Sequence, residues 1–159
     1  MTLFTEIEKE SKSIWAEISN RPFIRVGTAM CGVAVGAKTI ISEVKKVIDA
    51  NDVDATVSEV GCMGICFAEP ILDIKTPNGP RLLYGNVNVE DVEKIIDGCL
   101  GKSDLIESKL IGSLGERIQV PDTVIDLQED PIFKLQYKIA LRNAGEIDPC
   151  DINHYIGRG

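Results

Sequence analysis

Three cysteines in the first half of the chain have the residue type and spacing that metal or redox chemistry requires. Cys31 stands alone in an early segment, whereas Cys62 and Cys66 are separated by three residues in the sequence GCMGIC at positions 61–66. Two thiols at this spacing can reach one metal centre from a single turn, and a thiol from a distant segment can close the site from the other side. Iron–sulfur clusters are usually held by thiolates in this way. The pattern therefore predicts an iron–sulfur centre with Cys31, Cys62 and Cys66 as its ligands.

Glycines accompany all three cysteines. Gly32 follows the first thiol, and Gly61 and Gly64 lie on either side of the second. A residue without a Cβ lets backbone N–H groups approach a sulfur-ligated centre closely, and such N–H groups tune its potential. We therefore expect Gly32, Gly61 and Gly64 to contact the cofactor, although ordinary turn geometry explains any single one of them more simply.

The cysteine pattern leaves two questions open. Zinc sites and thioredoxin-type redox sites favour two residues between their cysteines, so the spacing of three argues against both, but a disulfide across it remains possible. A 2Fe-2S cluster normally takes four protein ligands, and only three are apparent. Cys99 is expected to be a small buried residue of a helix, and Cys150 a bystander or an interface residue. The fourth ligand is unassigned.

Composition excludes several classes of function. The 159 residues include 25 acidic and 17 basic side chains, which gives a net charge of −8. Such a surface repels nucleic acid, and no apolar run reaches the roughly 20 residues of a membrane span. Five cysteines, an odd number, fit a cytoplasmic metal or redox protein better than a secreted disulfide framework. With His154 as the only histidine, we expect no histidine-based catalytic residues.

Hydrophobic periodicity and turn signals predict the elements that position the cysteines. In chain order we expect a helix over 3–19, a strand over 23–27, a helix over 37–50, strands over 55–60, 71–75 and 81–85, and a helix over 89–100. This order predicts an α/β fold, a thioredoxin-like mixed sheet flanked by helices. Both cysteine segments follow strands, so we expect them to meet at one end of the sheet.

We divide the chain into an N-terminal amphipathic helix over 1–20, a sheet domain over 21–102, and a mainly helical extension over 103–159. The first helix either docks on a partner subunit or packs on its own domain. In the extension, Asp130 and Pro131 predict the start of a helix that continues to about residue 143, and a last short helix is expected over 148–156. Residues 103–127 are weakly patterned, which favours a segment that needs a partner surface.

Two sets of residues in this chain resemble a known family. Residues 27–37 and 61–70 resemble the thioredoxin-like 2Fe-2S ferredoxin domain at the N-terminus of NADH-oxidising flavin subunits. Those subunits belong to multimeric, electron-bifurcating FeFe-type hydrogenases and NAD-linked formate dehydrogenases, and are related to the flavin subunit of respiratory complex I. Residues 130–149 and 155–159 resemble the segment that leads into the flavin domain of the same subunits.

The resemblance implies a one-electron carrier module in the cytoplasm, part of a multisubunit NAD(H)-dependent oxidoreductase and not catalytic alone. Its partners would be a flavin/NADH domain and other iron–sulfur subunits. FMN and NADH would bind a region beyond residue 159 or on a partner, because the sequence stops where the family continues into that site. Gly36 stands where the four-cysteine domain has its second cysteine, which keeps a cluster-free assembly module open as the alternative. A thiol–disulfide enzyme using Cys62 and Cys66 is a third hypothesis.

Overall fold

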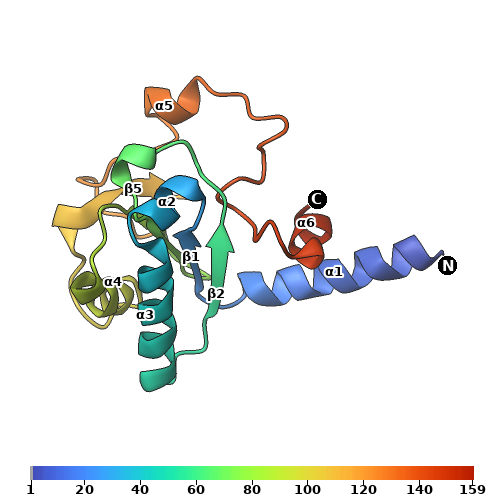
Figure 1. The fold of residues 1–159 in the computed structure, drawn as a ribbon, viewed down its shortest axis with the longest axis horizontal. Helices are drawn as coiled ribbons and strands as arrows, with labels where there is room; N and C mark the ends of the chain where they lie inside the picture. Colours follow the sequence, from blue (N-terminus) through green and yellow to red (C-terminus); the bar gives the residue numbers. More distant parts are fainter. Residues whose placement is uncertain (1) are drawn as a thin grey trace.

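A computed structural model describes residues 2–159, and a mixed five-stranded sheet forms its centre (Figure 1). The strand order is β2-β1-β3-β4-β5; β1 and β2 run parallel, and the other neighbouring pairs are antiparallel. The strands are β1 (Phe23–Gly27), β2 (Thr56–Val60), β3 (Leu72–Lys75), β4 (Arg81–Tyr84) and β5 (Leu110–Leu114).

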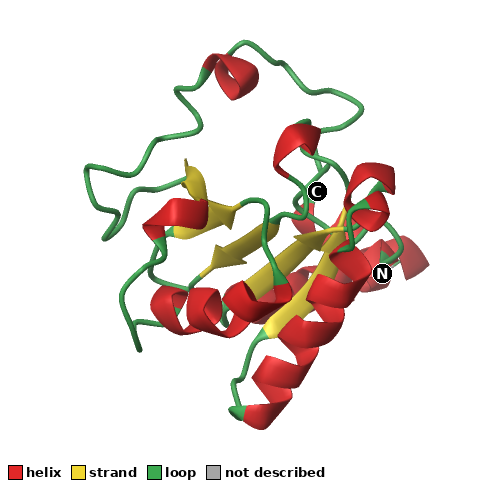
Figure 2. Cartoon of the chain, turned by 60° about the vertical axis from the view of Figure 1, so that its left-hand side comes forward, coloured by secondary structure: helices red, strands yellow, loops and turns green. Residues whose placement is uncertain are grey.

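One face of the sheet carries the hydrophobic core. The helices α3 (Ala37–Ala50) and α4 (Val92–Cys99), preceded by the short η2 (Val89–Asp91), pack on this face (Figures 1 and 2). Alternate residues of β1, β3 and β4, such as Ile24, Leu72 and Leu82, point into it and are fully buried. The predicted mixed sheet flanked by helices is confirmed, and the bounds predicted for α3 agree with the structure.

The opposite face carries the charged side chains of β1, β3 and β4 together with a smaller apolar cluster around Leu83, and the two ends of the chain cover part of it. We call it the polar face. The first helix, α1 (Leu3–Ser19), has the predicted bounds and lies along the last helix, α6 (Ile152–Arg158). The two helices come close enough that a Cβ on Gly157 would lie 2.4 Å from the Ser11 carbonyl oxygen. Of the two hypotheses for this helix, the structure shows packing against its own chain. Its N-terminal end extends away from the sheet (Figure 1). Leu3 and Phe4 at this end are exposed.

The extension differs from its prediction in three places. Residues 110–114 form β5 and lengthen the sheet, although they were not predicted as a strand. The predicted helix over 131–143 is wrong beyond its first turn, because α5 spans only Pro131–Lys134. Short isolated helices are marginal unless an apolar face is buried, and Leu135 and Ile139 are exposed. The final helix begins at Ile152 rather than near residue 148, with Asp151 as its N-cap.

Candidate metal centre

Cys62 and Cys66 lie together in the segment that follows β2. Their Sγ atoms are 3.4 Å apart, and the backbone N–H of Gly64 donates a hydrogen bond of 3.2 Å to Cys62 Sγ. Two thiolates on one tetrahedral metal, with metal–sulfur bonds of about 2.3 Å, lie about 3.7 Å apart. Gly64 has a φ of +100°, a conformation that glycine adopts without strain. The turn therefore holds two sulfurs at a separation that fits one metal ion, with a donor already on one of them.

The surroundings of Cys62 favour its protonated thiol in the metal-free protein. Burial raises the pKa of the Cys62 thiol above its usual value, and the adjacent Cys66 adds to the effect, whereas the Gly64 N–H opposes it. Thiolate is the form that binds metal, so metal binding must displace a proton here.

Cys31 is an exposed residue of the short helix α2 (Met30–Ala34). This helix lies at the end of the sheet where β2 ends (Figure 1). The two cysteine segments meet as predicted. A Cβ on Gly32 of α2 would lie 3.1 Å from Oε2 of Glu69, which follows the short helix η1 (Cys66–Ala68). The thiols themselves are only partly assembled. Within residues 2–159, no group of three or more cysteine, histidine, aspartate or glutamate side chains is arranged to hold a metal ion. The structure thus brings Cys62 and Cys66 together and leaves Cys31 on the neighbouring element.

The three candidate glycines have different surroundings. A Cβ on Gly32 would lie 2.2 Å from the Gly27 carbonyl oxygen, so close packing of α2 on the end of β1 already requires a glycine there. Gly61 has nothing within 4 Å of the position of a Cβ. Gly64 is the one whose N–H reaches a sulfur. Gly32 therefore has a packing role that the sequence pattern alone did not distinguish from a cofactor role.

Glu69 is a buried carboxylate that the cysteine pattern alone does not reveal. It lies between the two cysteine segments, where Oε2 accepts a hydrogen bond of 2.9 Å from the Ile71 N–H. A Cβ on Gly27 would lie 2.8 Å from its Oε1. An acid that directly follows a cysteine turn and precedes an apolar strand is the sequence signal that could have identified it. Burial raises the pKa of this carboxyl, and the Ile71 N–H opposes the rise.

This raised pKa makes a testable contribution to stability. The folded protein holds the Glu69 proton to higher pH than the unfolded chain does, so the free energy of unfolding falls as pH rises through the folded pKa. Glu69→Gln keeps an acceptor for Ile71 and removes the titration. We expect the variant to be more stable than the parent at pH 8 and to lose this advantage at pH 4, measured by urea unfolding. Glu93→Gln, at an exposed position of α4, is the control; equal pH profiles for both variants would contradict the assignment.

The other two cysteines are in contrasting places. Cys99 donates to the hydroxyl of buried Tyr84, with 3.7 Å between Sγ and Oη, and burial raises the pKa of Cys99 to about 12. Cys150 is exposed and lines, with Cys62, a largely apolar pocket of about 610 Å³ formed against residues 140–155. The structure therefore gives Cys99 the surroundings of a core residue and puts Cys150 near the candidate site.

His154 is a packing residue. Its ring lies edge-on to Trp15 and Phe23, with ring centroids 5.4 and 6.2 Å away, and its Nδ1 accepts a hydrogen bond from the Asp148 N–H. Within residues 2–159, no helix is long and apolar enough to cross a bilayer.

Comparison with solved structures identifies the class of fold. The chain has the thioredoxin-like fold of the 2Fe-2S ferredoxin from Aquifex aeolicus, with a TM-score of 0.50 and 18% identity, over 64% of this chain and 99% of that ferredoxin. A cysteine-to-serine variant of that ferredoxin gives a TM-score of 0.50 over 57% of this chain and 98% of the variant, also at 18% identity. At this level of identity the similarity concerns the fold alone.

Two curated relatives are similar in sequence. One is the NADP-reducing hydrogenase subunit HndB of Solidesulfovibrio fructosivorans, 22% identical over 90 residues, or 56% of this chain and 71% of that subunit. The other is a 2Fe-2S ferredoxin of Clostridium pasteurianum, 30% identical over 70 residues, or 43% of this chain and 66% of the ferredoxin. No family model matches the chain.

Proposed function

We propose that this chain is a one-electron carrier module that holds a 2Fe-2S cluster with Cys31, Cys62 and Cys66, in the cytoplasm. The observation that carries the proposal is the Cys62–Cys66 turn, with its sulfurs 3.4 Å apart and a backbone N–H on one of them. The similarity to a 2Fe-2S ferredoxin and to a hydrogenase subunit supports it. When bound, the cluster would accept and release one electron at a time.

The chain's own residues would supply ligands, position and electrostatics. The Sγ atoms of Cys62 and Cys66 are at a distance that fits one iron. Cys31 would have to approach them from α2, a helix of five residues in which its thiol is exposed. The Gly64 N–H stabilises negative charge on Cys62, and hydrogen bonds to sulfur are a main means of tuning the potential. Cys150 lines the same apolar pocket as Cys62, and it is therefore our candidate for the fourth ligand.

The proposal extends to the assembly in which the carrier works. We propose a multisubunit NAD(H)-dependent oxidoreductase of the hydrogenase or formate dehydrogenase type, with a flavin/NADH domain and further iron–sulfur subunits as partners. We propose the same division of the chain into three parts, at residues 20 and 102, with one change. The strand β5, which comes from the extension, is an edge strand of the sheet and belongs with the sheet domain. Exposed apolar side chains follow in the extension, among them Leu135, Tyr137 and Leu141, which suits a segment that contacts a partner.

Iron content after anaerobic purification and reconstitution tests the cluster. We expect about two irons per chain and visible absorption in the parent. Cys62→Ser should lose most of the iron, because it removes one of the two paired sulfurs. Cys99→Ser is the matched control and should retain it, because Cys99 lies against Tyr84. Iron retention by Cys62→Ser, with the fold intact by circular dichroism, would remove Cys62 from the site.

A cluster-free assembly module is the second candidate, and Gly36 is the residue that favours it. Gly36 has a φ of +101° at the start of α3, a conformation in which a cysteine would be strained. The position is therefore occupied by the residue that its backbone prefers. A reconstituted protein that is colourless, with free thiols and a native fold, would establish the assembly role. A reversible Cys62–Cys66 disulfide with reductase activity would instead support a thiol–disulfide enzyme.

A further inference from the structure

We propose that a second pocket, on the polar face of the sheet, binds a small oxyanion ligand bearing two or more negative charges on carboxylate or phosphate groups. The pocket has a volume of about 440 Å³. It is formed by the sheet, the C-terminal end of α1 and the C-terminal segment. Cys31, Cys62 and Cys66 are not among its lining residues. The proposal is therefore independent of the cluster.

Strand register places the cations of this pocket. Arg25 of β1 lies opposite Asp73 of β3, and Lys75 of β3 lies opposite Arg81 of β4. Because side chains alternate between faces, these four residues emerge on the same side of the sheet, opposite the apolar core. Three neighbouring strands thus present three basic side chains and one carboxylate to the same face.

The pocket is basic in a strongly acidic protein. Five basic side chains line it, Arg21, Arg25, Lys75, Arg81 and Arg158, and two acidic ones, Glu116 and Glu146. Arg21 is neutralised at the edge by Glu17 and Asp54, so the excess of positive charge comes from Arg25, Arg81 and Arg158, which pair with only two carboxylates, Asp73 and Glu146, and from Lys75. The whole chain, by contrast, has a net charge of −8. A concave site with an excess of one charge concentrates field lines and attracts ligands of the opposite sign.

Arg25 shows that the internal carboxylates do not satisfy the cations. Its side chain is 3% exposed, yet it makes one long hydrogen bond, 3.4 Å from Nη2 to Asp73 Oδ1. Its Nε has no hydrogen-bond partner, although Asp73 Oδ2 is 3.3 Å away, and its Nη1 is 3.6 Å from Glu146 Oε2. A guanidinium has five N–H donors, and a buried charge without full pairing is costly.

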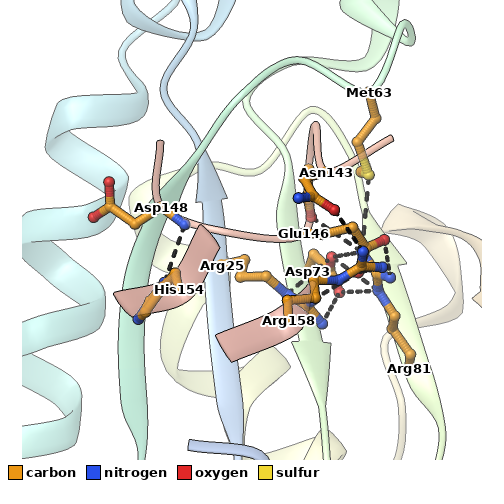
Figure 3. A network of polar contacts seen from close by, with 10 residues as sticks. Arg25, Met63, Asp73, Arg81, Asn143, Glu146, Asp148, His154 and Arg158 are labelled. Carbon is orange, nitrogen blue, oxygen red and sulfur yellow. Dashed lines mark hydrogen bonds and ion pairs between the residues drawn. The ribbon is translucent and has the colours of Figure 1, made fainter. Parts of the chain in front are cut away.

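Arg81 accounts for this deficit. It binds both oxygens of Asp73, with contacts of 2.6 to 3.1 Å, and Glu146 at 2.6 Å (Figure 3). Arg158 shares Glu146 and donates to Asn143 as well. Three arginines therefore compete for two carboxylates, and the positive charge left over lies at the floor of the pocket. Phe23, whose ring centroid is 4.6 Å from the Arg25 guanidinium carbon, compensates only in part.

The rim admits an organic body as well as charge. Trp15, Phe23 and Ile118 supply apolar wall, and Lys75 is exposed at the edge. An anion that enters between them would first contact Lys75 and the accessible parts of Arg81 and Arg158. The charge of the more deeply buried Arg25 would then attract it further. This arrangement fits a compact polyanion better than a monovalent ion, because more than one unpaired positive charge is available.

Isothermal titration calorimetry of the full chain with pyrophosphate and, separately, citrate tests the proposal, with sodium chloride matching the ionic strength. We expect saturable one-to-one binding of at least one probe, and the stronger probe identifies phosphate or carboxylate as the preferred group. Lys75→Glu should weaken binding about tenfold, because it reverses a charge at the rim. Lys45→Glu, on the exposed face of α3, makes the same charge change and should leave the affinity unchanged.

A second measurement reports on the floor of the pocket without disturbing it. In ¹⁵N-edited NMR spectra, the Arg25 Nε–H resonance should shift on titration with the probe that binds. Absence of saturable binding by both probes, or equal weakening by Lys75→Glu and Lys45→Glu, would overturn the proposal. Neither result bears on iron content, so the pocket and the cluster are tested separately.

Discussion

Asp73→Asn should destabilise the protein by about 3–5 kcal/mol, the usual cost of removing one partner from a buried ion pair. Asp73 is 1% exposed and lies within 3.3 Å of Arg25 and 2.6 Å of Arg81, closer to Arg25 than Glu146 is. Its neutralisation leaves Arg25, Arg81 and Arg158 around Glu146 alone. Because domains of this size are stable by only about 5–15 kcal/mol, the loss is a large part of the total.

Urea unfolding measures this effect as a shift of the midpoint at unchanged slope. Asp54→Asn is the matched control, since Asp54 also pairs with an arginine, Arg21, at 3.1 Å but is 83% exposed. Exposed pairs contribute only about 0–1 kcal/mol, so the control should stay close to the parent. Similar shifts for the two variants would contradict the prediction, because they would show that the buried pairs of Asp73 with Arg25 and Arg81 stabilise the protein no more than an exposed pair does.

Local signals predicted the elements that have a complete pattern in the sequence. The apolar stripes of 3–19 and 37–50 predicted both helices with their observed bounds. The Asp130–Pro131 pair predicted the start of α5, where Asp130 accepts from the Ile132 N–H. The length of α5 could not be predicted in the same way. A longer helix needs an apolar surface on which residues 135–143 can pack, and hydrophobic periodicity does not show whether the fold provides one.

Long-range pairing accounts for what the sequence did not reveal. β5 contains Gly112 and is followed by Gly115, so it has little strand propensity of its own; its place comes from pairing with β4 and contact with Leu127. The polar face is similar, because Arg25 and Asp73 are 48 residues apart and only the register of β1 with β3 joins them. Their signal was present as Arg25 in the otherwise apolar β1 and as Asp73 between two buried apolar residues of β3, since a charge in such a position needs a partner across the sheet.

The candidate site likewise has one part that depends on local sequence and one part that depends on long-range packing. The Cys62–Cys66 pair is local, and its spacing predicted a shared turn, which the structure contains. Cys31 depends on how α2 sits on the end of β1, and that packing is set by Gly27, Gly32 and Glu69. A spacing rule could propose the third ligand, but only the packing of α2 decides whether its thiol reaches the other two.

Gly32→Ala should therefore both destabilise the protein and impair cluster retention. The added Cβ would lie 2.2 Å from the Gly27 carbonyl oxygen and 3.1 Å from Glu69 Oε2. A backbone oxygen cannot move aside as a flexible side chain can, so α2 must lift off the end of β1 and carry Cys31 with it. Overpacking of this kind typically costs about 1–3 kcal/mol.

Gly61→Ala separates this packing effect from a general loss of glycine near the thiols. No atom lies within 4 Å of a Cβ at Gly61, so its stability in urea should remain close to that of the parent, and any loss of iron there would reflect contact with the cofactor alone. In Gly32→Ala the two losses should occur together, because one displacement causes both. A Gly32→Ala protein with parental stability and full iron content would show that α2 can adjust without moving Cys31. It would contradict our inference that packing at Gly32 positions the third ligand.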